Sequence, residues 1–224
     1  MNNTPALLQV FFGITTLISV FLFYRATQQS WLSLLVLGIW LIVQTGISLT
    51  GFYTVTNTMP PRFLLMVLPP FIFMALLFIT PKGKTFIDSL DTKALTLLHI
   101  VRIPVEMVLF YLFLYKLVPQ LMTFEGRNLD ILSGLSAPFI FYFGYIKKTI
   151  SEKIIMIWNI VCLFLLVNIV VNAIFSAPFP FQKFAFDQPN IGVLYFPYVW
   201  LPCCIVPLVL FSHLVCIRQL LKNK

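Results

Sequence analysis

The chain has 224 residues, of which 60% are apolar and 10% are charged, and its formal net charge is +8 at pH 7. Soluble domains carry about 25% charged residues, so this composition excludes an ordinary soluble domain and indicates a protein whose solvent is the lipid bilayer. The basic residues collect in short loops between apolar runs, where they orient a membrane protein. No nucleic-acid partner is therefore expected.

Seven apolar segments have lengths that suit membrane-spanning helices. They cover about residues 5–24, 31–50, 62–80, 94–118, 130–147, 153–176 and 196–217. The sequence therefore predicts an all-α integral membrane protein, a seven-transmembrane-helix bundle that forms a single polytopic membrane domain over residues 1–224.

The loop charges predict the orientation of this bundle. Ten basic residues follow the first, third, fifth and seventh segments, namely Arg25, Lys82, Lys84, Lys93, Lys147, Lys148, Lys153, Arg218, Lys222 and Lys224. The opposite side holds four, which are Arg62, Lys116, Arg127 and Lys183. The positive-inside rule then places the N-terminus outside and the C-terminus in the cytoplasm, and we expect the plasma (inner) membrane.

Segment 94–118 carries charged side chains near the middle of the bilayer. His99, Arg102 and Glu106 stand at i, i+3 and i+7, so they share one helical face, and Arg102 and Glu106 are expected to touch directly. A lone arginine at that depth costs roughly 2.5 to 3.5 kcal/mol, so other helices must supply polar groups. A buried ion pair that only fixes helix packing and a functional ligand or ion site both remain open.

Segment 153–176 offers asparagines that can bond across to another helix. Asn168 and Asn172 stand at i and i+4, and Asn168 matches Glu106 in depth, so both join His99, Arg102 and Glu106 as candidates for a ligand site or ion path. Nearer the cytoplasmic boundary, Asn159 and His213 fall at about the depth of His99, within roughly 10 Å of that boundary. They are candidates for an inner cluster.

The outer turn before residue 130 is dense in polar groups. Glu125, Arg127, Asn128 and Asp130 bring both charge signs to the expected extracytoplasmic mouth of the bundle. A helix cap with a local salt bridge and a ligand-contacting role are both consistent with this composition.

Several enzyme classes lack their residues. Segment 196–217 has no lysine for a retinal Schiff base, and neither HExxH nor GxGD occurs. Ser136 lies in a GxSx sequence, but His99 and His213 fall at a different depth and cannot activate it. The four cysteines lie in apolar runs without CxxC spacing. No catalytic residue, metal or cofactor is expected, which argues against an enzyme without excluding one.

The leading hypothesis is a bundle that binds or passes a small ligand or ion through a polar interior formed by the last four segments. The aromatic, proline-rich loop at residues 178–187 would cap the outer mouth. Two alternatives stay open, a membrane-embedded lipid-modifying enzyme and a non-catalytic assembly subunit. The expected partners are the lipid bilayer, a small ligand, ion or lipid, and another membrane protein.

Overall fold

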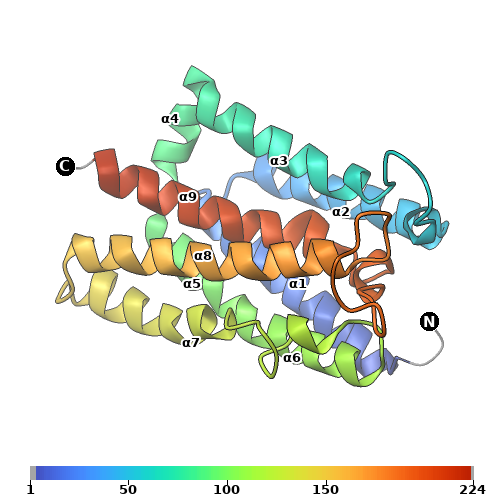
Figure 1. Ribbon diagram of the computed structural model, residues 1–224. Coiled ribbons are helices and arrows are strands. Elements are labelled where there is room, and N and C mark those ends of the chain that lie inside the picture. Colours follow the sequence, from blue (N-terminus) through green and yellow to red (C-terminus); the bar gives the residue numbers. More distant parts are fainter. Residues whose placement is uncertain (1–3, 223–224) are drawn as a thin grey trace.

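The computed structural model describes residues 4–222, and every regular element within that range is helical (Figure 1). The α-helices are α1 (Ala6–Ala26), α2 (Trp31–Leu49), α3 (Leu64–Ile79), α4 (Pro81–Ser89), α5 (Thr92–Leu98), α6 (Arg102–Leu114), α7 (Ile131–Phe139), α8 (Glu152–Ser176) and α9 (Val206–Lys222). The short elements are the 3-10 turns η1 (Phe52–Thr54), η2 (His99–Val101), η3 (Gln120–Met122) and η5 (Gly192–Leu194), and the π-helical turns η4 (Ile140–Ile146) and η6 (Leu201–Ile205). The prediction of an all-α fold is confirmed for this range.

Five helical stretches are long and apolar enough to cross a membrane. They are Ala6–Ala26, Trp31–Leu49, Thr92–Leu114, Glu152–Ser176 and Leu201–Lys222. The helices α3 and α4 would add a sixth span if taken together, and Ile131–Ile146 is a shorter apolar helix. The predicted segments 62–80 and 130–147 are thus the two whose helices are short.

The chain bends by 95° between α3 and α4. The Thr80 side chain accepts a hydrogen bond from the backbone of Gly83 at 3.2 Å, and Pro81 occupies the first position of α4, where its missing N–H costs nothing. A Cβ at Gly83 would overlap the carbonyl of Leu77, so the turn requires glycine. As a result α4 lies across one end of the bundle (Figure 1).

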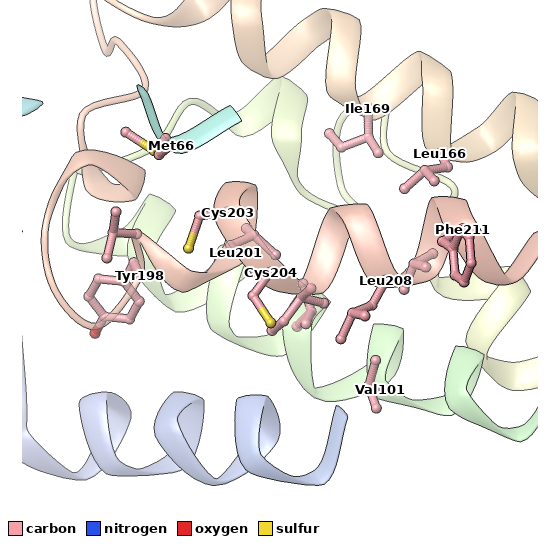
Figure 2. Packing of buried hydrophobic residues seen from close by; sticks show 14 of the residues in the cluster. Met66, Val101, Leu166, Ile169, Tyr198, Leu201, Cys203, Cys204, Leu208 and Phe211 are labelled. Atoms are coloured by element: carbon pink, nitrogen blue, oxygen red, sulfur yellow. The ribbon is translucent and has the colours of Figure 1, made fainter. Parts of the chain in front are cut away.

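The stretch formed by η6 and α9 is the most buried of the five, with 67% of an 18-residue part of it buried inside the protein. It packs against α8 and α5, as Figure 1 shows. Figure 2 shows Cys203, Cys204, Leu208 and Phe211 following one another along this stretch among the other buried side chains of the core.

The chain between α6 and α7 is irregular apart from η3 and folds back into the bundle. It packs on α6 and α8 through η3, and Val118, Met122, Thr123 and Asn128 within it are buried. Helix α7 then begins beside η2, where a Cβ on Gly134 would lie 3.2 Å from the Cβ of Arg102. The predicted outer turn therefore ends in the interior of the protein.

The segment between α8 and η6 is held to the ends of α6 and α8. Gln188 donates to the carbonyls of Phe113 and Val118 at 2.9 and 2.6 Å, and the backbone of Asn190 donates to Ser176 at 2.8 Å. These contacts place the segment over the end of the bundle opposite α4 (Figure 1).

Candidate functional site

The inward face of α5, η2 and α6 presents His99, Arg102 and Glu106, whose exposed fractions are 0%, 2% and 2%. Pro104 has no backbone N–H, so it cannot donate to the carbonyl of Ile100 in the preceding turn. At this point the helix tightens into the 3-10 turn η2. All three predicted side chains thus point into the protein rather than toward lipid.

Arg102 forms its ion pair with Asp130, at 2.7 Å between Nη1 and Oδ1. The same nitrogen lies 3.5 Å from the carbonyl oxygen of Cys162, and Nη2 lies 3.0 Å from Nε2 of His213. The expected salt bridge between Arg102 and Glu106 is not formed: among residues 4–222 the partner of Arg102 is Asp130. The expectation failed because the spacing along one helix carries no information about a carboxylate from another segment.

Asn128 connects Glu106 to Asp130. Its Nδ2 donates to Oε1 of Glu106 at 2.5 Å and to the carbonyl of Met122 at 3.0 Å, while its Oδ1 accepts from the backbone N–H of Asp130 at 3.0 Å. Asn128 is fully buried and Asp130 is 5% exposed. The structure therefore places these two residues beside Arg102 and Glu106 rather than at the mouth of the bundle. The Asp130 carboxylate, moreover, bonds to Arg102 and does not cap α7.

His213 on α9 extends the network toward α8. Its Nδ1 lies 2.9 Å from Oδ1 of Asn159, and the Nδ2 of Asn159 donates to the carbonyl of Ile155 at 2.9 Å. Because that asparagine oxygen can only accept, Nδ1 of His213 carries the proton, and Nε2 is free to accept from Arg102. This pattern fits the neutral imidazole without conflict.

His99 lies flat on His213, with ring centroids 3.9 Å apart and planes 17° apart. The rings of His99 and Trp158 pack in a T-shaped arrangement, with their centroids 5.5 Å apart. The two His99 ring nitrogens have no hydrogen-bond partner among the described residues, and the same holds for Nε of Arg102 and Oε2 of Glu106. Buried polar atoms without partners are uncommon in native structures, so these four atoms call for an explanation.

We call this group the polar cluster. It consists of His99, Arg102, Glu106, Asn128, Asp130, Asn159 and His213. Its hydrogen bonds run from Glu106 through Asn128, Asp130, Arg102 and His213 to Asn159, and His99 is stacked against the chain they form. The predicted inner cluster and two of the predicted mouth residues thus meet in one site.

The other candidates lie outside the polar cluster. Asn168 is exposed and donates to the carbonyl of Arg127 at 2.9 Å, and Asn172 bonds back to Asn168. Glu125 and Arg127 have exposed side chains and take part in none of the ion pairs within residues 4–222. Asn168 thus holds the segment between α6 and α7 against α8, and Glu125 and Arg127 lie exposed on that segment.

Sequence reasoning missed Ser133 and Trp158 as neighbours of the site. Ser133 is fully buried one turn after Asp130, and Trp158 donates to Ser136 at 2.8 Å while flanking His99. A tryptophan beside an asparagine in an apolar helix carries no signal that separates it from ordinary packing. Within the described range, no group of at least three histidine, cysteine, aspartate or glutamate side chains could hold a metal ion.

A family model described as "Domain of unknown function (DUF8737)" matches residues 60–221, which include the whole polar cluster. No curated protein and no solved structure matches the chain.

Proposed function

Since the chain belongs to the family described as "Domain of unknown function (DUF8737)", we propose a function from the geometry of its polar cluster. The description of the family gives no activity. We propose that the protein binds or passes a small ion, in the first place a proton, through this cluster. In this proposal α3 and the stretch Ile131–Ile146 join the five longer stretches as membrane spans, giving seven.

The observation that carries the proposal is the continuous chain of buried hydrogen bonds from Glu106 to Asn159. Its residues come from α6, from the segment before α7, from α8 and from α9, and each is at most 5% exposed. Ionisable groups at membrane depth are costly, and they tend to mark ion paths or proton relays.

The chemistry of the polar cluster favours a proton over larger ions. Glu106, Asp130 and the two histidines can each gain or lose a proton, whereas Arg102 keeps its charge. Arg102 pairs with one of the two carboxylates, so the other has no cationic partner within the cluster. The cluster therefore combines a fixed charge with four groups that can each take up or release a proton, and of these Glu106, Asp130 and His213 are joined to one another through Asn128 and Arg102.

The backbone around the polar cluster supports this proposal. Irregular chain at membrane depth is tolerated where it is buried in protein or lines a site, and transporters use such interrupted helices around their ligands. The segment before α7 has this character and supplies Asn128 and Asp130. The π-helical turns η4 and η6 and the 3-10 turn η2 are further departures of a kind that is frequent at functional positions.

The charge distribution supports the predicted orientation in the plasma membrane. The basic residues of α4, of the turn before α8 and of the end of α9 belong to elements that lie at one end of the bundle, on the left in Figure 1. We propose that this end faces the cytoplasm and that the N-terminus lies outside.

Proton flux into liposomes tests the proposal. Purified protein is reconstituted with a pH-sensitive dye inside the vesicles, and flux is recorded after a potential is imposed in either direction. Wild-type protein should give a flux above empty liposomes, and Glu106→Gln, which keeps the shape of the side chain, should abolish it. The matched control is Glu125→Gln, which changes an exposed carboxyl group and should leave the flux unchanged.

Two results of these measurements would contradict the proposal. If wild-type protein gives no flux in either direction, the polar cluster does not conduct protons. If Glu106→Gln lowers thermal stability in detergent while flux per folded molecule stays the same, Glu106 serves packing and the proposal fails at that residue.

A further inference from the structure

A second feature, separate from the polar cluster, is an apolar groove on the side of the bundle. It lies between α2, α3 and the stretch formed by η6 and α9, and its volume is about 300 Å³. Its walls include Phe23, Val36, Trp40, Met74, Leu77 and Phe211. Ser33 is the one hydroxyl-bearing side chain among the residues that line it.

The groove is continuous with the surface that faces lipid. Helix α2 contributes its wall from Leu32 to Trp40, which corresponds to roughly 12 Å along the helix axis. The outer face of the same helix exposes Leu35 and Ile39, at 44% and 54%. A molecule that enters the groove from the side therefore comes from the hydrocarbon layer and not from water.

Small side chains and a fixed indole shape the floor of the groove. Cys203 and Cys204 of η6 line it, and larger residues at these positions would fill the space. Figure 2 shows both cysteines among the buried side chains of this stretch. The indole N–H of Trp40 donates to the carbonyl of Cys203 at 2.9 Å, which satisfies the polar atom of the wall. What remains open is an apolar surface suited to a hydrocarbon chain.

One end of the groove meets α4, a helix that carries two lysines. Phe86 of α4 lines this end, and Lys82 stands four residues earlier, on the same face of that helix. Lys82 takes part in no ion pair within the described residues, where Asp88 is paired with Arg218 and Lys222.

We propose that this groove binds one acyl chain of an anionic phospholipid, whose phosphate lies beside Lys82. The apolar walls recognise the chain, and the uncompensated cation recognises the headgroup, since basic residues at the membrane surface attract anionic lipids. The site is independent of proton movement through the polar cluster.

Fluorescence quenching by brominated lipids tests the site, because Trp40 lies in its wall. A variant that retains only Trp40, made by Trp31→Phe, Trp158→Phe and Trp200→Phe, is reconstituted in phosphatidylcholine that contains a small fraction of brominated lipid. Brominated phosphatidylglycerol should quench Trp40 at least twofold more than brominated phosphatidylcholine at the same fraction. A variant that retains only Trp31, which is 70% exposed, should be quenched equally by both.

Matched substitutions locate the chain and the headgroup. Val36→Phe fills the groove and should remove the preference for phosphatidylglycerol, whereas Val43→Phe should not; the two valines have similar exposure, 47% and 45%, but only Val36 lines the groove. Lys82→Gln should also remove the preference, while Lys153→Gln, an exposed lysine on α8, should retain it.

Equal quenching of Trp40 by the two lipids overturns the proposal, as does a preference that survives Val36→Phe. Native mass spectrometry of protein with all its tryptophans provides a second measurement if the single-tryptophan variants do not fold. There, the wild type should retain one phosphatidylglycerol molecule, and Val36→Phe should lose it. Retention by both proteins, or by neither, contradicts the site.

Discussion

Arg102 is paired with Asp130, 28 positions further along the chain, and not with Glu106, which lies one turn away on its own helix. This single contact ties α6 to the start of α7. The charge that the sequence places on one helix therefore binds a carboxylate from another segment of the chain.

The pair predicts strong coupling between its members. Arg102→Leu and Asp130→Leu should each lower the free energy of unfolding by about 3–5 kcal/mol, because each leaves a buried charge without its partner. The double substitution should cost less than the sum of the two. Unfolding in mixed micelles measures the cycle, and a parallel cycle with Glu106→Leu in place of Asp130→Leu should show weaker coupling. Additive losses for Arg102 and Asp130 would contradict the contact.

Asn128 predicts a second loss of stability. Asn128→Leu removes the donor to Glu106 and Met122 and the acceptor for the backbone of Asp130, so it should cost about 1–3 kcal/mol. The control is Asn168→Leu, whose side chain is exposed, and this substitution should cost less. Equal losses from both substitutions, in the same micelle assay, would mean that the buried hydrogen bonds of Asn128 do not stabilise the fold more than an exposed asparagine does.

Gly134 predicts a packing defect. A Cβ at this position would lie 2.9 Å from Cγ1 and 3.1 Å from the backbone nitrogen of Ile103. Gly134→Ala should therefore push α7 away from the start of α6 and lower the free energy of unfolding by about 1–3 kcal/mol. Gly38→Ala meets open space and should cause no loss. Thermal unfolding in detergent compares them, and an unchanged midpoint for Gly134→Ala would contradict the close approach.

Asp88 predicts a contribution to the free energy of unfolding that depends on pH. Hydrogen bonds from Lys222 and Arg218 lower the pKa of this carboxyl group below its ordinary value, so the ionised form favours the folded state. The contribution is present above the unfolded pKa of about 3.9 and is lost as the pH falls through the lowered folded pKa. At pH 7, Asp88→Asn should cost less than about 1 kcal/mol, since the partners are partly exposed. Unfolding of both proteins should converge on acidification, and a difference that grows instead would contradict the pairing.

The proposed orientation predicts the location of reporters. A reporter fused after Lys224 should report the cytoplasm, and an epitope placed near Gln188, beside the exposed Phe186, should be accessible from outside. Accessibility assays on intact and permeabilised cells decide between the two sides. The reverse pattern would overturn the orientation drawn from the loop charges.

Sequence patterns predicted much of the helical layout, because apolar length and loop charge are local properties. They also predicted that His99, Arg102 and Glu106 share one face. They could not predict that Asn128 and Asp130 reach that face, since nothing local distinguishes a polar turn in water from one that folds back into a bundle. Helix α6 ends at Leu114, four residues before the predicted end of its segment, whereas the stretch Ile131–Ile146 differs from the predicted segment 130–147 by one residue at each end.

The shortness of the stretch Ile131–Ile146 has a consequence for biogenesis. At 1.5 Å per residue it extends roughly 24 Å, less than the ~30 Å hydrocarbon layer, and it follows an aspartate. Such a stretch is poorly suited to partition alone from the translocon into lipid. Because Arg102 is synthesised before Asp130, we expect the preceding span to be held until Asp130 follows, so that the two segments enter the bilayer together as a hairpin.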